Sequence, residues 1–284
     1  MAFRFHLAGL EQVLWLPSVK TAGARNVLLS AYAFICDKPR YPIVGSPVPK
    51  TDIPAILARE FDHVILDSGL FTLMFGADAG ARTAADIINW TDRFIDFITQ
   101  YVPPSISCVE VDCQKLCGPE LAWELRKKMR DKLPRHTIIN VIHLEDMPRL
   151  GELVDFAQYV AISVPELRKS ELDPVESVHR LVYFIKNRRP GLPIHLLGCA
   201  DGKILRPVCS QICSADAATW LVPLKLGMYR AFTDAPASLA DRMLRAYEDV
   251  FKKPPPPDYP GLHQCGASIL AWQALRKIYQ YGGY

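Results

Sequence analysis

Short apolar runs alternate with amphipathic stretches along most of the chain. Runs of this length, rich in Val, Ile and Leu and bounded by polar or turn-forming residues, are typical of buried strands. Eight runs fit this pattern, and we expect strands over residues 12–16, 27–34, 63–67, 106–112, 137–142, 159–163, 194–197 and 212–216.

The stretches between the runs have the period of amphipathic helices, most clearly over 84–101, 119–132, 174–189 and 202–209. Thr83 stands where it can cap the first of these helices. Asp173 followed by Pro174 supplies a cap and then a proline at the first helical position of the third. The pattern therefore predicts strands and helices in alternation.

Eight strands alternating with helices predict a parallel sheet, and eight is the number that closes a (β/α)8 TIM barrel. An open doubly wound sheet is the alternative, but no G-x-G-x-x-G or G-x-x-x-x-G-K-[ST] motif follows any run. We expect the barrel over residues 1–235. A helical appendage is expected over 236–284, with helices at 238–251 and 267–281 on either side of the proline run 254–257.

Composition excludes several classes of protein. The chain has 284 residues, 50% of them hydrophobic, which excludes a disordered or fibrous protein. The net charge of +3 excludes a uniformly basic polyanion-binding protein but leaves a local basic face open. No apolar stretch is long enough to span a membrane, the N-terminal stretch lacks the pattern of a secretory signal, and the eight cysteines are scattered. These features predict a cytoplasmic protein with reduced thiols and no membrane partner.

Polar residues gather where the predicted strands end, which in a barrel is the face that carries catalysis. Strand ends that simply adjoin polar loops are the alternative explanation. Carboxylates, an imidazole and a glycine would share one mouth, which predicts an enzyme with carboxylate chemistry; the residues are Asp67, Ser68, Glu110, Asp112, His143, Ser163, Gly198 and Asp216.

Five of these segments resemble motifs of the tRNA-guanine transglycosylase (queuine tRNA-ribosyltransferase) superfamily. They are LDSGLF at 66–71, VEVDC at 109–113, NVIH at 140–143, AISVPE at 161–166 and HLLG at 195–198. Asp216 follows Gly198 by 18 residues, close to the family's distance from that glycine to its nucleophilic aspartate. The resemblance runs from about residue 27 to 220, with the motifs in the family's order.

This resemblance implies an enzyme that exchanges a purine base by breaking and remaking an N-glycosidic bond. Asp216 would be the nucleophile that forms a covalent glycosyl-enzyme intermediate. Asp67 would be the general acid/base, with its pKa raised by partial burial. The structural alternatives are a turn residue for Asp67 and a helix cap for Asp216.

The same resemblance implies a pocket for a guanine-like base. Asp112 would accept hydrogen bonds from the base edge, His143 would bind O6 or the 7-substituent, and Ser68 would contact the sugar or phosphate. A structural partner for an arginine, a core histidine and a turn serine are the respective alternatives. Backbone contacts to the base are expected at Ala161, Ile162 and Gly198.

The nucleic acid must present its base outside the duplex stack, where an aromatic side chain can hold it. Phe71 and Tyr32 are the two candidates for this stacking. Cations that follow the last two strands are expected to bind the phosphate backbone; these are Lys203, Arg206, Lys225 and Arg230.

The chain departs from the family in ways that narrow the partner. The family's CxCxxC zinc site should follow the nucleophile, but only Cys265, beside His263, lies there. We therefore expect no metal and no cofactor, with structural zinc as an open alternative. A short, zinc-poor chain with an altered pocket most resembles the phage and bacterial branch that inserts 7-deazaguanines, such as a preQ0-like base, into DNA.

The expected partners are thus DNA and a free 7-deazaguanine base. The apolar C-terminal helix leaves a homodimer open. The alternatives are a transglycosylase acting on tRNA, a non-catalytic barrel subunit, and an unrelated barrel lyase or aldolase. The last would require a lysine at a strand end, and none of the predicted strand ends has one.

Overall fold

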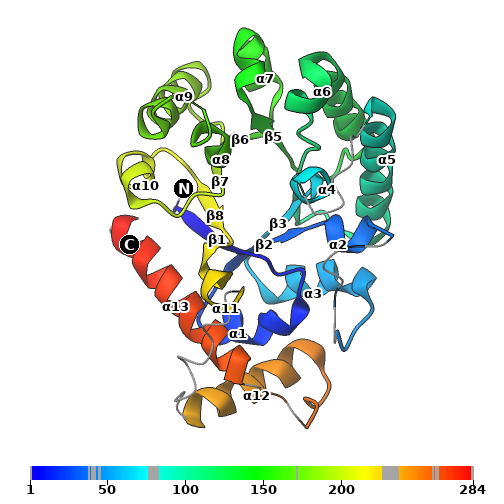
Figure 1. Ribbon diagram of the computed structural model, residues 1–284, viewed down its shortest axis with the longest axis vertical. Coiled ribbons are helices and arrows are strands. Elements are labelled where there is room, and N and C mark those ends of the chain that lie inside the picture. The colour runs from blue at the N-terminus through cyan, green and yellow to red at the C-terminus, as the bar shows by residue number, and fades with distance from the viewer. Residues whose placement is uncertain are drawn as a thin grey trace.

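Eight parallel strands close into one barrel in sequence order (Figure 1). The structure is a computed structural model that describes residues 2–37, 39, 43, 46–75, 83–170, 172–225, 237–257, 259 and 262–282. The predicted (β/α)8 barrel is confirmed. Its strands are β1 (Arg4–Ala8), β2 (Asn26–Ser30), β3 (His63–Asp67), β4 (Ser107–Val109), β5 (Ile138–Ile142), β6 (Tyr159–Ser163), β7 (Ile194–Leu197) and β8 (Ser214–Ala217).

Helices surround the barrel, and short ones stand over its opening (Figure 1). The longer ones are α1 (Leu16–Thr21), α3 (Ile53–Glu60), α5 (Ala84–Tyr101), α6 (Gln114–Lys132), α7 (Leu150–Phe156), α9 (Pro174–Arg188), α10 (Gly202–Val208), α12 (Ala237–Phe251) and α13 (Leu262–Gly282). The short ones are α2 (Tyr32–Ile35), α4 (Leu70–Phe75), α8 (Val164–Leu167) and α11 (Val222–Lys225). The 3-10 turns are η1 (Val13–Trp15), η2 (Lys50–Asp52), η3 (Leu144–Arg149) and η4 (Thr219–Leu221).

The helix caps act as the sequence predicts. Thr83 and Asp86 form a reciprocal capping box at the start of α5. The Asp173 side chain accepts hydrogen bonds from the backbone N–H groups of Val175 and Glu176 at the start of α9. Each cap fixes the point at which the chain leaves a loop and turns back along the barrel.

The first strand lies earlier in the chain than we expected. The strand predicted over 12–16 is wrong, because that segment forms η1 and the start of α1, where Pro17 occupies the first turn. The true first strand, β1, carries polar residues at alternate positions, so no continuous apolar run marks it. His6 is nevertheless fully buried, between the strands rather than in solvent.

Two predicted strands are shorter than the apolar runs that suggested them. The run over 27–34 ends as a strand at Ser30, and its remainder forms α2. The run over 106–112 contributes only Ser107–Val109 to the sheet. In both cases the residues past the strand turn over the barrel mouth, where the site is built.

Two layers of core lie on either side of the sheet. The larger fills the space between strands and helices, and the smaller lies inside the barrel, with Ile65, Val109 and Ile139 among its members. Alternate side chains of a strand point to opposite faces, so inward positions share one register. Neighbouring strands pair His6 with Asp216 and Ala161 with His195.

The C-terminal helices pack on the barrel. α12 packs against α1, and α13 packs against α1 and α10. As a result α13 lies on the side of the barrel where β8 meets β1 (Figure 1). Among the described residues, no helix is long and apolar enough to cross a membrane.

Candidate active site

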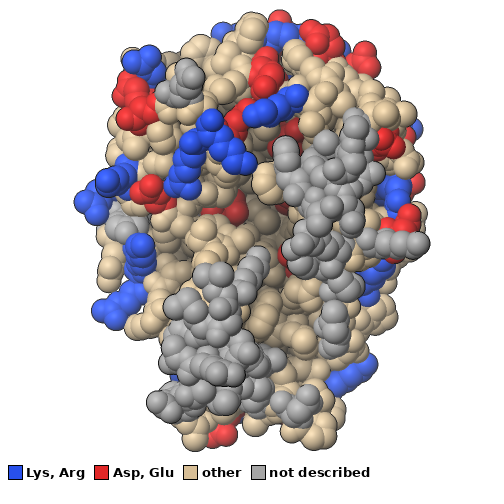
Figure 2. Space-filling view, viewed as in Figure 1, with Lys and Arg blue, Asp and Glu red and all other residues tan. Residues whose placement is uncertain are grey.

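Acidic side chains collect at the mouth formed by the carboxyl ends of the strands. Asp67 ends β3, Asp112 follows β4 and Asp216 lies in β8, while Glu11 is close enough to Asp67 to act on its ionisation. The surface is hollowed near the barrel axis, with acidic side chains in the hollow and Lys and Arg side chains on one rim (Figure 2). The mouth therefore combines an acidic floor with basic groups at its edge.

Asp216 is held by two donors on the same oxygen. Its Oδ1 accepts the backbone N–H of Gly198 at 2.9 Å and lies 3.1 Å from Nε2 of His195. No described residue makes a hydrogen bond to Oδ2. The side chain is 8% exposed. This arrangement orients the carboxyl group and leaves Oδ2 free to react.

Gly198 can occupy its position only because it lacks a side chain. Its φ is +60°, and a Cβ there would lie 2.6 Å from Cγ of Pro165 in α8. The loop after β7 thereby brings its N–H against Asp216. The glycine that the sequence singled out serves to orient the predicted nucleophile.

Asp67 has fewer donors than Asp216 and lies among other acidic groups. Its Oδ2 accepts the N–H of Gly69 at 3.0 Å, and no described cation pairs with it. Burial, together with the charges of Asp112, Asp216 and Glu11, raises its pKa to about 7. A carboxyl group with this pKa can give or take a proton near neutrality.

Gly69 makes the turn that presents Asp67. Its φ is +76°, and a Cβ there would lie 2.6 Å from the backbone nitrogen of Tyr32. The backbone N–H of Ala31 donates to the Asp67 carbonyl at 2.8 Å, which ties this strand end to the end of β2. The DSG segment is therefore a tight turn as well as the carrier of a titratable group.

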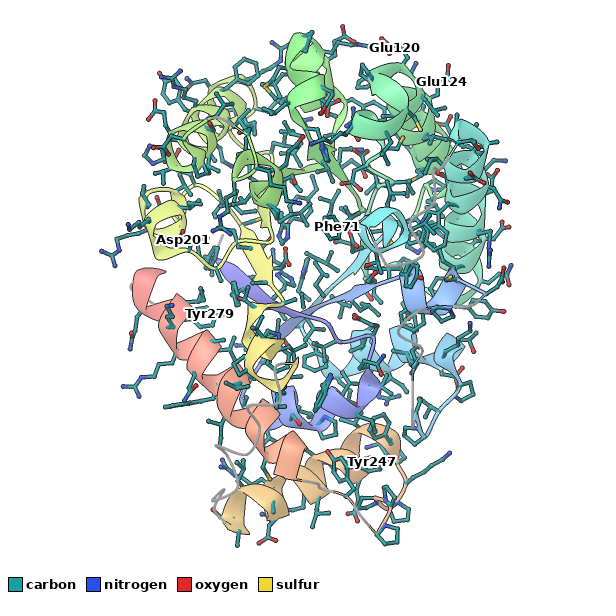
Figure 3. The ribbon with its side chains drawn as sticks, in the orientation of Figure 1. Phe71, Glu120, Glu124, Asp201, Tyr247 and Tyr279 are labelled. Carbon is teal, nitrogen blue, oxygen red and sulfur yellow. The ribbon has the colours of Figure 1, made fainter. Side chains whose placement is uncertain are left out.

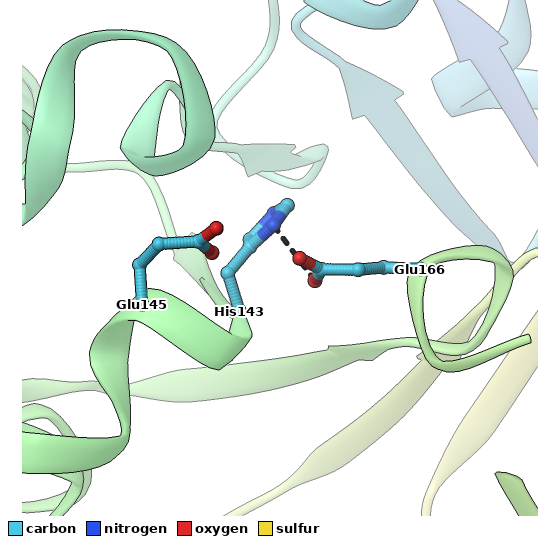
Figure 4. A group of neighbouring side chains, drawn as sticks. All are labelled: His143, Glu145 and Glu166. Carbon is cyan, nitrogen blue, oxygen red and sulfur yellow. Dashed lines mark ion pairs between the residues drawn. The ribbon is translucent and has the colours of Figure 1, made fainter. Parts of the chain in front are cut away.

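His143 lies between two carboxylates, at the point where β5 ends. Its Nε2 is 3.0 Å from Asp112 Oδ2, and its Nδ1 is 2.9 Å from Glu166 Oε2 (Figure 4). Burial alone would lower the pKa of His143, but these two carboxylates raise it to about 10. The mouth thus holds an imidazolium that is hydrogen bonded to Asp112 through Nε2 and forms an ion pair with Glu166 through Nδ1.

Among the described residues, one group has donor atoms placed as metal ligands might be. The donor atoms of His143, Glu145 and Glu166 lie within 4.8 Å of one another. Two of these atoms, His143 Nδ1 and Glu166 Oε2, form an ion pair with each other. Acidic groups of this kind are common without an ion, so the cluster by itself does not identify a metal site.

Cys265, the cysteine that follows the predicted nucleophile, lies in an apolar environment. Cys265 is buried on α13 in a small apolar cluster with Leu239 and Met243. The side chain of His263 lies outside the described residues. Burial raises the pKa of the Cys265 thiol, which disfavours the thiolate that binds metal.

Several predicted base-binding residues are buried in the backbone framework. Ser68 is fully buried, and its hydroxyl accepts the N–H of Leu70 at 3.4 Å, as a turn serine would. Ala161 and Ile162 lie inside β6, paired with β5 and β7, rather than in the loop beyond it. Ala161 belongs to the core inside the barrel, whereas Ile162 packs in the core between the strands and the helices.

The two aromatic candidates differ in exposure. Phe71 is 60% exposed on α4, at the edge that borders the barrel centre, and Lys169 Nζ lies 5.5 Å from its ring centre (Figure 3). Tyr32 is 7% exposed and packs against Trp90. Only Phe71 of this pair offers an accessible ring.

The structure places half of the predicted backbone-binding cations. Lys203 lies in the first turn of α10 and Arg206 in its last turn, and both are exposed. Arg230 and the side chain of Lys225 lie outside the described residues. Lys169, which follows α8 at the rim, was not predicted from the sequence.

Sequence reasoning also missed two residues that complete the site. His195 was quoted only as part of HLLG, and Glu166 only as the end of AISVPE. The alternation along β7 could have indicated His195, because it shares its inward register with Leu197 at the strand end. Glu166 lies in a helix after β6, so only the fold brings it to His143.

Compared with known proteins, the chain matches no protein-family model and no curated protein.

Proposed function

We propose that this protein is a base-exchange transglycosylase that replaces guanine in DNA with a 7-deazaguanine base. One observation carries the proposal: a single barrel mouth holds Asp216, whose carboxylate is oriented by two donors, and Asp67, whose pKa is about 7. A nucleophile and an acid/base in these two states are what glycosyl transfer through a covalent intermediate requires.

In the first half of the reaction, Asp216 Oδ2 attacks C1′ of the target nucleotide. The C1′–N9 bond breaks, its electron pair leaves with guanine, and Asp67 donates a proton to the departing base. In the second half, N9 of the incoming base attacks C1′ and the ester to Asp216 breaks. Asp67 then takes the proton that the incoming base loses, so the enzyme returns to its starting state.

Asp112 and His143 supply the base-reading contacts of this proposal. A carboxylate accepts from N1–H and the exocyclic amine of a guanine-like edge. His143 occupies Oδ2 of Asp112, so Oδ1 is the oxygen available for the base. The His143 imidazolium fixes that carboxylate and adds a positive charge beside the base O6 or 7-substituent.

Phe71 and the lysines at the rim would bind the nucleic acid, the aromatic ring through the flipped base and the lysines through phosphates. A flipped base stacks on an exposed aromatic ring, and this contact is worth about 1–3 kcal/mol. We favour DNA over tRNA because the chain resembles the short, zinc-poor branch of the superfamily. The preference for DNA rests on this resemblance, so the exchange assay includes both DNA and tRNA.

The test is an exchange assay with radiolabelled guanine and with a labelled 7-cyano-7-deazaguanine base. Each is incubated with the protein and either single-stranded DNA, duplex DNA or tRNA. We expect label in DNA and a protein–DNA adduct on a denaturing gel. Label in tRNA alone would replace DNA with tRNA, and no incorporation into any of them would favour a non-catalytic barrel.

Asp216→Asn tests the nucleophile in the same assay. The amide cannot attack C1′, so we expect the adduct to vanish and exchange to fall by at least about a thousandfold. Asp201→Asn is the matched control, since Asp201 caps α10 beside the mouth without facing the reaction. An adduct that persists in Asp216→Asn would remove the residue from this role.

A further inference from the structure

A line of hydrogen-bonding groups runs through the interior of the barrel to Asp216. Ser214 Oγ lies 2.6 Å from both the Tyr159 hydroxyl and Nδ1 of His195, and Nε2 of His195 lies 3.1 Å from Asp216 Oδ1. At the far end, Cys213 Sγ lies 3.0 Å from the Tyr159 hydroxyl. His195 and Ser214 are fully buried.

The hydrogen-bond directions along this line follow from its end. The carboxylate of Asp216 only accepts, so Nε2 of His195 must carry the proton that bridges them. Nδ1 then accepts from the Ser214 hydroxyl, and Ser214 Oγ in turn accepts from Tyr159. Every member of the line then donates toward Asp216, so Ser214 and Tyr159 hold the Nε2–H of His195 toward the carboxylate.

We propose that His195 is a positioning residue that makes Asp216 a good leaving group in the second half of the reaction. The inference rests on the proposed transglycosylase function. When the glycosyl ester forms through Oδ2, Oδ1 becomes the ester carbonyl oxygen. As the C1′–Oδ2 bond breaks, negative charge returns to the carboxylate, and the donors from His195 and Gly198 are already aimed at Oδ1.

The histidine and tyrosine nearest to His195 do not donate a hydrogen bond to Asp216. His6 of β1 lies with its ring centre 5.8 Å away, and Tyr159 of β6 at 6.5 Å. Burial lowers the pKa of His6 well below its ordinary value, so it stays neutral. His6 Nδ1 faces the Ala215 carbonyl and its Nε2 faces His63, so His6 does not compete for Asp216.

The test compares His195→Phe with His195→Gln in single-turnover and steady-state exchange. Phenylalanine keeps a ring and loses the donor, whereas the glutamine amide reaches about where Nε2 lies and keeps one. For His195→Phe we expect steady-state exchange to fall about 10²-fold, with KM for DNA unchanged. Adduct formation should fall much less, so the adduct accumulates, and His195→Gln should recover most of the turnover.

Ser214→Ala provides a milder variant that does not remove the ring. It frees His195 to adopt either tautomer, so we expect an intermediate loss of turnover with the same accumulation of adduct. Melting temperatures of all three variants identify any that fail to fold. Nitrogen-15 spectra of histidine-labelled wild-type protein should show His195 protonated at Nε2 alone.

The outcomes separate this inference from the proposed function. If the wild-type protein exchanges no base on any nucleic acid, both are overturned. If the wild-type protein is active and folded His195→Phe keeps full turnover, or loses adduct formation and turnover equally without recovery in His195→Gln, the inference alone fails. A proton found on Nδ1 instead of Nε2 would likewise overturn the inference while leaving base exchange intact.

Discussion

Two groups of carboxylates lie within one barrel, and only one of them is paired with a cation. Outside the sheet, Glu110 and Asp146 face the guanidinium of Arg126, which contacts them at 2.9 and 2.8 Å and is 2% exposed. Inside the mouth, Asp67 and Asp216 have no described cationic partner. All four residues are acidic, so the difference lies in the groups around each carboxylate.

In the outer group every charge is met. Arg126 also donates to the Val141 carbonyl, and Gln114 donates to Asp146 at 2.9 Å. Burial alone would lower the pKa of Arg126, but Glu110 and Asp146 raise it above its ordinary value. This network pairs both carboxylates with Arg126 and joins α6 to β5 and the turn η3.

In the mouth, burial and the negative charges of neighbouring acids raise the pKa of Asp67 to about 7. Like charges in a partly buried site hold one carboxyl group in its protonated form. Burial raises the pKa of the paired Glu110 as well, so a raised pKa by itself does not mark a catalytic acid. What distinguishes Asp67 is the absence of a neutralising partner among the surrounding described groups.

Asp67→Asn is the sharpest way to break the comparison. If Asp67 protonates the departing base, we expect adduct formation to fall by about 10²–10⁴-fold, measured in single-turnover assays. In the wild-type protein, adduct formation should decline as the pH rises through about 7, because the acid form is then lost. The variant should lack that decline; an unchanged pH profile would exclude Asp67 as the acid.

Asp67→Asn should also change how the free energy of unfolding depends on pH. The raised pKa means that the folded protein holds a proton that the unfolded chain releases between about pH 4 and 7. The free energy of unfolding should therefore fall as pH rises through this window, and the stabilisation should be gone above pH 7. Denaturant titrations of Asp67→Asn should show a flatter dependence, since the amide does not titrate.

Arg126→Met tests the other side of the comparison. Removing the guanidinium strands Glu110 and Asp146 as buried charges, so we expect the free energy of unfolding to drop by about 3–5 kcal/mol. Exchange per folded molecule should stay unchanged. Arg180→Met is the control, because that arginine is 79% exposed beside Glu176 and should cost less than about 1 kcal/mol. A stable Arg126→Met with impaired exchange would contradict the division.

Lys203→Ala should give the smallest effect. Lys203 is exposed on α10, outside the acidic floor. If it contacts a phosphate, we expect DNA affinity to fall a few-fold for every sequence, with a salt dependence shallower by about one ion. Binding measured between low and moderate salt checks this. Lys186→Ala on α9 is the control, and a loss confined to particular sequences would contradict a phosphate contact.

The sequence by itself determined the architecture and the order of the site. Apolar runs and caps predicted seven of the eight strands and the main helices, because burial on both faces leaves a run of apolar residues wherever a strand lies. β1 was not predicted because the polar side chains of Arg4 and His6 interrupt its apolar pattern. The ends of the predicted strands also supplied the candidates Asp67, Asp112, His143, Gly198 and Asp216.

Only the tertiary structure decided what those residues do to one another. Hydrogen bonds and pKa shifts depend on distances between segments far apart in the chain, and sequence spacing does not contain them. The fold separated Glu110, which Arg126 neutralises, from Asp67, which other acids surround. It also brought His195 to Asp216 and Glu166 to His143, because closing the barrel makes neighbours of strand ends that the chain keeps apart.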